Sequence, residues 1–358
     1  MNAENVAAQY EGVYPMTIIE SGGRSALHPR HLEEDTSSFQ PFDIACETVL
    51  LDIRNQNFSF RNHLLIDNEL NAIFADTFTE NEVLGFRRYA PRQCHRIAGS
   101  IAYLSNTWVD NYYHWMQLTL PLLRFYRTMV RNEEIDFYYV GESHLARIQE
   151  ETLLRFGVRP QQIVRHPCRG DRLFTAICLH RPQRGGLRHR DMWGHQFVRS
   201  IYAVEPDRAS PARIYIRRGN TWTRNLTNEA EVIAMLGSLG FAPVSMDGLT
   251  CEAQARLFAN AEIIIGVHGA ALTNLLFASE GCKVVEIFPS GTQEASFFTA
   301  AAYTKAEYYY LLGDPSVGRS QSFTIDLQKF ARLLRMAAIR GLGDKAAICC
   351  NDAPSVAN

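Results

Sequence analysis

Residues 261–274, with the sequence AEIIIGVHGAALTN, decide the fold of this chain. Ile263–Val267 is an uninterrupted apolar run, which is typical of a strand buried in a parallel sheet. The run ends at His268, which lies between two glycines, and an Ala- and Leu-rich segment with helical character follows at once. The sequence therefore predicts a buried strand, a tight turn, and a helix whose first N–H groups point beyond the carboxyl end of the strand.

This turn has the features of a phosphate site. The unpaired N–H groups and the positive dipole end of a helix favour an anion, and glycine leaves no Cβ in the way of a ligand. The fingerprint G-x-G-x-x-G is not met, so a dinucleotide such as NAD is not indicated. The alternative is a tight strand-to-helix turn with a hydrogen-bonded histidine. The candidate phosphate-binding residues of the turn are Gly266, His268, Gly269, Ala270, Ala271, Thr273 and Asn274.

Three further blocks accompany the turn. Residues 213–219, RIYIRRG, predict a strand that ends in Arg217 and Arg218. Residues 282–289, CKVVEIFP, predict another strand, which carries Glu286 inside an apolar run. Residues 111–117, NYYHWMQ, lie far upstream and precede a leucine-rich segment.

Together the four blocks resemble glycosyltransferase family 61, whose members share an N-Y-x-H-W block, an arginine-ended strand, a G-x-H-G-A-x-L-T-N turn and a V-x-E strand. The resemblance covers about residues 95–310. It implies an α/β fold of the GT-B type, with two Rossmann-like domains facing across a cleft. It also implies an inverting glycosyltransferase that moves a sugar from a nucleotide sugar to a glycan acceptor. The family includes eukaryotic enzymes of the secretory pathway and bacterial proteins of capsule or surface polysaccharide synthesis. We expect this chain to be of the bacterial kind.

The donor is expected at the carboxyl ends of the strands in the second domain. Arg217, with Arg218 as its substitute, would neutralise the diphosphate together with the turn around His268. Glu286 would be costly to bury alone, so it either bonds ribose or donor-sugar hydroxyls or forms an ion pair. For Thr273 and Asn274, helix capping is the alternative to donor contact.

The chain contains neither a D-x-D triplet nor a His/Cys cluster with metal-ligand spacing. We therefore expect transfer without a metal and with no cofactor other than the nucleotide-sugar co-substrate, which we expect to be UDP-linked.

The acceptor side is expected at the 111–117 block. Asn111 and His114 are three residues apart and would share a helix face. The resemblance makes His114 the leading candidate for the base that deprotonates the acceptor hydroxyl, and a pKa near 6.5 suits that role. Asp110 competes for the same role. Tyr113 and Trp115 could stack on sugar rings or belong to the core.

The pattern of strands and helices predicts two α/β domains. We expect a loosely ordered lead-in over 1–40, an acceptor-side domain over 41–180 and a linker over 181–211. A donor-binding domain over 212–325 follows, then a helix over 326–345 that could cross back onto the first domain, and a tail over 346–358. Asn228 is expected to cap a helix, with Glu231 completing a capping box.

Composition limits the partners. Hydrophobic residues make up 46% of the 358 residues and the net charge is -2, which is ordinary for a globular protein and gives no general reason to bind nucleic acid. The eight cysteines form no C-x-x-C pair, and there is no signal-like start or membrane-length apolar run. These features predict a cytoplasmic protein. The basic cluster over 184–190 is either a solvated loop or a contact with an anionic acceptor or the inner face of a membrane.

Two other function classes stay open. A nucleotide-sugar hydrolase or epimerase on the same fold would need an acidic dyad, and no paired carboxylates adjoin the histidine blocks in sequence. A catalytically silent binding or assembly subunit would keep the scaffold but lose polar site residues.

Overall fold

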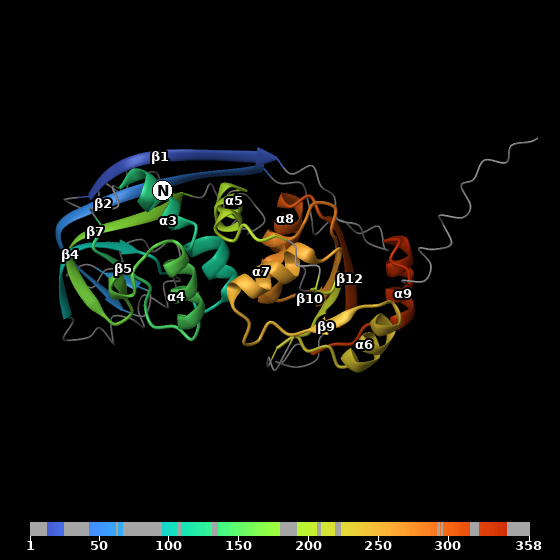
Figure 1. Ribbon diagram of the computed structural model, residues 1–358. Coiled ribbons are helices and arrows are strands. Elements are labelled where there is room, and N and C mark those ends of the chain that lie inside the picture. The colour runs from blue at the N-terminus through green and yellow to red at the C-terminus, as the bar shows by residue number, and fades with distance from the viewer. Residues whose placement is uncertain are drawn as a thin grey trace, which may run out of the picture. The chain divides into compact units, whose positions relative to one another are not determined.

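A computed structural model describes residues 13–24, 43–61, 64–66, 95–105, 109–130, 135–179, 192–205, 209–218, 223–291, 294, 296–315 and 322–341. These residues belong to two compact units, which divide between Ala203 and Val204 (Figure 1). Trp108, the 184–190 loop and the 346–358 tail lie outside the described residues.

The first unit is built on a mixed sheet with the strand order β1-β2-β7-β4-β5-β6, and β3 pairs with β2. β7, β4, β5 and β6 run parallel, whereas β2 is antiparallel to both β1 and β7. The antiparallel strands β1 and β2 therefore extend the sheet beyond β7, at one edge of its parallel part. The strands are β1 (Val13–Arg24), β2 (Asp43–Arg61), β3 (Leu64–Ile66), β4 (His95–Tyr103), β5 (Phe137–Tyr139), β6 (Ile163–Val164) and β7 (Cys168–Leu179).

The helical pattern expected after residue 111 consists of two helices. The π-helix η2 (His114–Thr119) ends just before Pro121, which begins the α-helix α3 (Leu122–Met129) as its N-cap. Proline fits there because its missing N–H is not needed in the first turn of a helix. The other helices of this unit are α4 (Ala146–Arg155), η4 (Pro160–Gln162) and α5 (Met192–Ile201).

The second unit is a five-stranded, wholly parallel sheet with the order β12-β11-β10-β8-β9. Numbered within the unit, this is the doubly wound order 2-1-3-4-5, in which the winding reverses between β8 and β10. The strands are β8 (Arg213–Ile216), β9 (Ala242–Val244), β10 (Ile263–Val267), β11 (Lys283–Ser290) and β12 (Glu307–Pro315). The helices are α6 (Glu229–Ser238), α7 (Cys251–Asn260), the 3₁₀-helix η5 (Ala270–Phe277), α8 (Ser296–Tyr303) and α9 (Leu327–Met336).

Helices cover both faces of this sheet. Ile263, Ile265 and Val267 point to one face, where they share a buried cluster with Val232 of α6 and Phe330 of α9. The intervening residues point to the other face, which α7, η5 and α8 cover (Figure 1). Burial on both faces explains why β10 is an apolar run without alternation.

The helices and strands differ from several of the expected domain boundaries. β1 lies within the expected lead-in, and α5 lies within the expected linker. α9 packs on its own unit, where Phe330, Leu333 and Leu334 are buried in the core. The sheet of each unit contains parallel strands and helices pack on it, which agrees with the α/β class, while the GT-B arrangement stays a prediction.

The expected capping box is wrong. Asn228 is the N-cap of α6, but its side chain makes no capping bond. Its amide instead donates to the carbonyl of Ile325 at 3.0 Å and accepts from the N–H of Ile325 at 3.2 Å. A bond between distant segments has therefore replaced the local one.

Candidate functional site

The loops at the topological switch point carry the residues expected to bind the donor. Ile216 and Gly266 are partners in the parallel register of β8 and β10, so Arg217 and His268 follow neighbouring strands at the same edge. Glu286 is the partner of Gly266 on the other side, in β11. The carboxyl edge of an open parallel sheet at a switch point is where ligands bind in this architecture.

A buried hydrogen-bonded chain lies behind this edge. Glu286 is 0% exposed, and its Oε1 lies 2.5 Å from Nδ1 of His268. The Tyr308 hydroxyl donates to Oε2 of the same carboxylate at 2.5 Å. The side chain of Glu286 thus meets His268 and Tyr308 inside the protein, and not a ribose or sugar hydroxyl as one expectation had it. Its ion pair is with a histidine, which the sequence did not indicate.

Nε2 of His268 faces a second carboxylate, at 3.4 Å from Oε2 of Glu294. Burial opposes a charge on the imidazole, but Glu286 and Glu294 outweigh burial and raise the pKa of His268 above 6.5. The hydrogen bond to His268 lowers the pKa of Glu294 to about 2. The arrangement therefore favours a protonated His268 that donates from both ring nitrogens.

Aromatic rings enclose the same imidazole. The ring of Phe288 stacks on His268 with centroids 4.9 Å apart, and Phe297 of α8 lies 5.1 Å away. Glu294 also accepts a hydrogen bond from the Ser296 hydroxyl at 2.8 Å. His268 is therefore held in orientation by packing as well as by its two carboxylates.

The two arginines after β8 have different roles. The Arg218 guanidinium donates to the backbone carbonyls of His268 and Thr223, and burial lowers its pKa to about 10. The Arg217 side chain is 53% exposed, and its Nε lies 4.0 Å from Oε2 of Glu229. Arg217 is consequently the more available partner for an anion, while Arg218 ties two loops together.

The glycines of the turn make room for the protein's own side chains. A Cβ on Gly269 would collide with the Arg218 guanidinium, and one on Gly266 would come within 3.2 Å of Ile216. These contacts explain both glycines without a ligand. Ala270 and Ala271 begin η5, so their N–H groups have no partner inside that helix.

The last two residues expected to bind the donor lie in the interior. Thr273 and Asn274 are both 0% exposed. The Asn274 amide donates to the side chain of Gln254 at 2.7 Å and to the Ala271 carbonyl at 3.1 Å. Asn274 therefore ties η5 to α7 in this structure.

On the first unit, the 111–117 block separates into surface and core. Asn111 is exposed, and Tyr113 and His114 are partly buried with their rings 5.2 Å apart. Trp115 is 0% exposed, and its Nε1 donates to the Thr152 hydroxyl at 3.0 Å. Trp115 therefore belongs to the core, whereas the partly exposed His114 can meet a substrate. π-helical turns such as η2 are frequent at functional sites.

Asp110 has a partner that the sequence did not suggest. Its Oδ1 accepts from the backbone N–H of His144 at 3.2 Å and lies 3.9 Å from that residue's Nδ1. His144 precedes α4 and is exposed. Thirty-odd residues separate the two in sequence, so no local pattern could have paired them.

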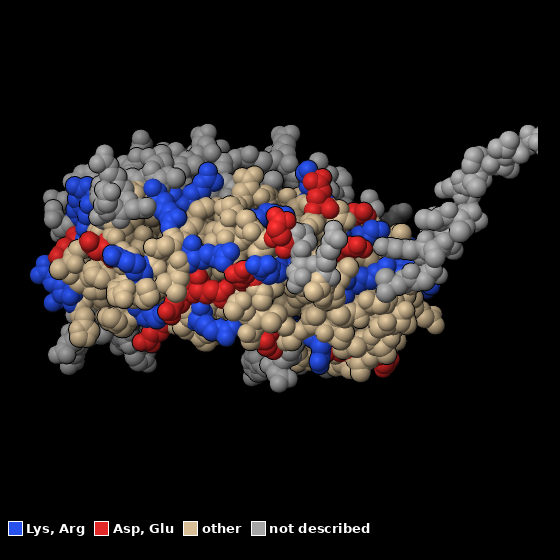
Figure 2. Space-filling model, viewed as in Figure 1, with Lys and Arg blue, Asp and Glu red and all other residues tan. Residues whose placement is uncertain are grey.

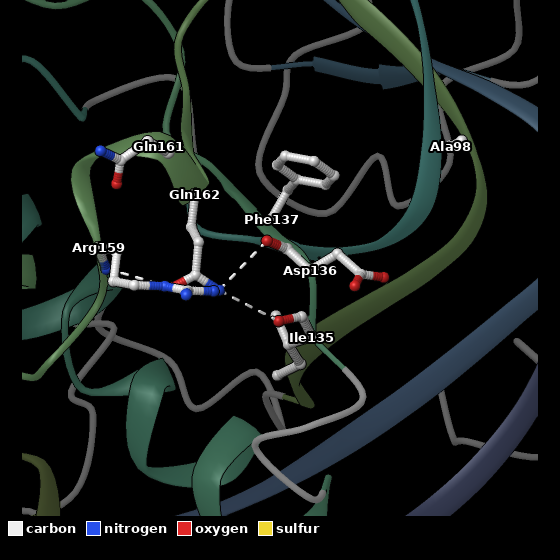
Figure 3. A pocket seen from close by; sticks show the side chains of 7 residues that line it. All are labelled: Ala98, Ile135, Asp136, Phe137, Arg159, Gln161 and Gln162. Atoms are coloured by element: carbon white, nitrogen blue, oxygen red, sulfur yellow. Dashed lines mark hydrogen bonds between the residues drawn. The ribbon is translucent and has the colours of Figure 1, made fainter.

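A surface pocket of about 420 Å³ lies elsewhere on the first unit (Figure 3). It opens at the amino end of β5, the edge opposite to the one where ligands usually bind. Gln162 donates to the carbonyls of Ile135 and Asp136, and the Asp136 carboxylate accepts from Ser100. These lining groups satisfy one another, so the pocket indicates no chemistry. Its lining residues are Ala98, Ile135, Asp136, Phe137, Arg159, Gln161 and Gln162.

The described residues on one face of the molecule carry charges of both signs. Figure 2 shows acidic and basic side chains interspersed over the face in view. Among the described residues, no three or more His, Cys, Asp and Glu side chains gather as a metal site would require. Within the same ranges, no helix has the length and apolar character to span a membrane.

A family model matches the middle of the chain. Residues 112–285 match the family model of Glycosyltransferase 61. The matched segment contains His114, both arginines and the His268 turn, so the expected resemblance to glycosyltransferase family 61 is supported there.

The relatives are all named as glycosyltransferases. The beta-1,2-xylosyltransferase XAX1 of Oryza sativa subsp. japonica is 28% identical over 225 residues, which cover 60% of this chain and 37% of the relative. The alpha-1,3-arabinosyltransferase XAT3 of the same plant is 31% identical over 112 residues, 27% of this chain and 19% of the relative. The human protein O-linked-mannose beta-1,4-N-acetylglucosaminyltransferase 2 is 36% identical over 72 residues, 19% of this chain and 12% of the relative.

These matches span well under half of the length of each relative. They come from plants and animals, so they do not support the bacterial capsular type that we expected.

Proposed function

We propose that this chain is an inverting, metal-independent glycosyltransferase that moves a sugar from a UDP-linked donor to a glycan acceptor. One observation carries the proposal. A histidine paired with the carboxylates of Glu286 and Glu294 lies at the switch point of a doubly wound sheet, beside Arg217 and Arg218. The match to glycosyltransferase family 61 over residues 112–285 supports the same conclusion.

The donor half of the proposal follows from charge. When the glycosidic bond breaks, negative charge grows on the leaving nucleoside diphosphate. Arg217 and His268 supply fixed positive groups, and the first N–H groups of η5 add a partial positive charge. Cations that are already in place need no reorganisation during the reaction, so they favour the transition state over the bound substrate.

The acceptor half assigns His114 as the base. Its side chain is partly buried at the start of η2, next to the Tyr113 ring. A neutral imidazole could take the proton of an acceptor hydroxyl while that oxygen attacks the anomeric carbon from the face opposite to the diphosphate. Asp110 is the alternative base, and His144 would then orient its carboxylate.

The donor sugar is to be sought among the sugars in the relatives' names. A thermal-shift screen of UDP-xylose, UDP-arabinose and UDP-N-acetylglucosamine, with free nucleoside diphosphates, would detect binding as a rise in the melting temperature. We expect the strongest donor to give the same shift with and without EDTA. A shift that EDTA abolishes and Mn²⁺ restores would contradict the metal-independent mechanism.

Hydrolysis is a second candidate that one observation favours. Two carboxylates flank His268, although the sequence showed no acidic pair beside it. Glu286 is fully buried, which leaves Glu294 as the one of the two that could reach a substrate. Release of free sugar at the full rate in the absence of any acceptor would favour hydrolysis over transfer.

A cytoplasmic location with membrane contact through the 184–190 loop stays a prediction. That loop lies outside the described residues. Sedimentation of the protein with anionic vesicles would test the contact, since polybasic segments bind such surfaces in a salt-dependent way.

A further inference from the structure

The two carboxylates on His268 are held very differently. Glu286 is 2.5 Å from Nδ1, completely buried, and fixed from behind by Tyr308. Glu294 is 3.4 Å from Nε2, and its side chain is 51% exposed. An ion pair with an exposed member contributes little to stability, so Glu294 is the partner that a ligand could replace.

The balance of charges at the carboxyl edge of the sheet also points to Glu294. Apart from Arg217, which lies 4.0 Å from Glu229, the described cations at this edge are His268, Arg218 and Arg224, and the charge of Arg224 acts on the other two. Of the carboxylates, Glu286 is occupied on both oxygens inside the core, which leaves Glu294 as the surface counter-ion of the group. A carboxylate and a diphosphate present the same kind of group to a donor, namely anionic oxygens that only accept hydrogen bonds.

We propose that Glu294 is a displaceable counter-ion, whose carboxylate holds the place on Nε2 of His268 that an oxygen of the donor diphosphate takes when it binds. The inference rests on the proposed function, since it takes the ligand to be a diphosphate. In the free protein Glu294 keeps His268 paired. After transfer, the returning carboxylate competes with the nucleoside diphosphate and hastens its release.

The decisive experiment compares two charge-neutralising variants of the same unit. Glu294→Gln removes the proposed competitor. Glu280→Gln removes an equal charge near the amino end of β11, where Glu280 pairs with Lys305 at 3.0 Å. Isothermal titration with inorganic pyrophosphate and with UDP would give the affinity of each protein. We expect Glu294→Gln to bind both ligands about tenfold tighter than the unaltered protein, with slower release of UDP. Glu280→Gln should bind like the unaltered protein.

Unchanged or weaker binding by Glu294→Gln would overturn the inference, and weaker binding would make Glu294 a direct ligand contact. An equal gain in Glu280→Gln would also overturn it, because the effect would then be one of net charge. If Glu294→Gln fails to fold, Glu294→Asp, which draws the carboxylate back by one methylene, should show a smaller gain, and no gain would count against the proposal.

The two proposals fail separately. If UDP binds and Arg217→Ala abolishes that binding, yet Glu294→Gln has no effect, the donor site stands and the counter-ion role falls. If pyrophosphate binding tightens in Glu294→Gln while no nucleotide binds either protein, the anion site and its counter-ion stand and the glycosyltransferase proposal falls.

Discussion

The two histidines of this protein that lie in family-like motifs occupy opposite kinds of environment. His268 is 4% exposed, with a carboxylate at each ring nitrogen and an aromatic ring stacked on it. His114 is partly exposed on a π-helix, beside another aromatic side chain. A group that stays charged is suited to neutralise a leaving group, whereas a group that takes a proton from the acceptor must be within reach of that substrate. The contrast therefore separates an electrostatic role from a proton-transfer role.

The largest expected effect concerns the proton-transfer role. His114→Ala should lower kcat by roughly 10²–10⁴-fold, the usual contribution of a general base, while donor affinity stays unchanged. Steady-state kinetics and donor titration measure the two effects. His166→Ala, which removes an exposed histidine of the same unit, serves as the control. Near-normal turnover in His114→Ala would move the base elsewhere, and Asp110→Asn would be the next variant to measure.

The next largest effect is expected for replacement of Glu286, which should lower the free energy of unfolding. Glu286→Ala leaves Nδ1 of the buried His268 and the Tyr308 hydroxyl without their partner, which should cost about 3–5 kcal/mol of unfolding free energy. Tyr308→Phe removes only one donor to the carboxylate, with an expected cost of about 1.5–3 kcal/mol. Urea denaturation measures both. Equal stability of Glu286→Ala and the unaltered protein would show that the buried chain is not formed.

The exposed arginine should matter for binding and the inner one for structure. Arg217→Ala should lose about 2–3 kcal/mol of affinity for the donor diphosphate with little change in melting temperature. Arg218→Ala should lower the melting temperature first, because its guanidinium bonds two backbone carbonyls. Calorimetric titration and thermal unfolding distinguish them. Unchanged donor affinity in Arg217→Ala would move the phosphate contact to another residue.

The smallest expected effect is a pH dependence of stability. Because the folded-state pKa of His268 is raised, its contribution is fully present below the unfolded value near 6.5 and is lost as the pH rises through the folded value. The unaltered protein should therefore lose stability relative to His268→Gln as the pH rises above about 6.5. Denaturation curves at several pH values measure this difference. Parallel profiles of the two proteins would mean that His268 does not become more basic on folding.

The sequence could predict those parts of the site that lie in segments with a regular apolar pattern. Ile263–Val267 and the residues around Glu286 are apolar runs of strand length, so both strands and the glycine turn between β10 and η5 were expected. The contact between Glu286 and Tyr308 depends on which strand lies beside β11, and strand order is not written in either segment. Glu294 lies in a connection without any periodicity, so nothing in the sequence drew attention to it.

The same limit explains the alternatives left open on the first unit and the wrong capping box at Asn228. The 111–117 block gave the helix but could not separate Trp115, which faces the core, from His114, which does not. Asparagine is a common N-cap residue. The side-chain amide of Asn228 nevertheless forms two hydrogen bonds with the backbone of Ile325 instead of one capping bond to its own helix. Residue types set which bonds are possible, and tertiary contacts select among them.

Arg218 has a consequence for how tightly the spacing of the donor site is specified. The pairing of β8 with β10 brings the two loops to the same edge of the sheet, but it ends at Ile216 and Gly266, and the chain then leaves β8 toward α6 on one face and β10 toward η5 on the other. The Arg218 guanidinium bridges them through the His268 carbonyl, and Gly269 is what lets it come so close. The Arg218 side chain thus helps to set the distance between Arg217 and His268. Lysine at position 218 would keep the charge but lose the planar fork, so a ligand sensitive to that spacing would be bound less selectively and not merely less tightly.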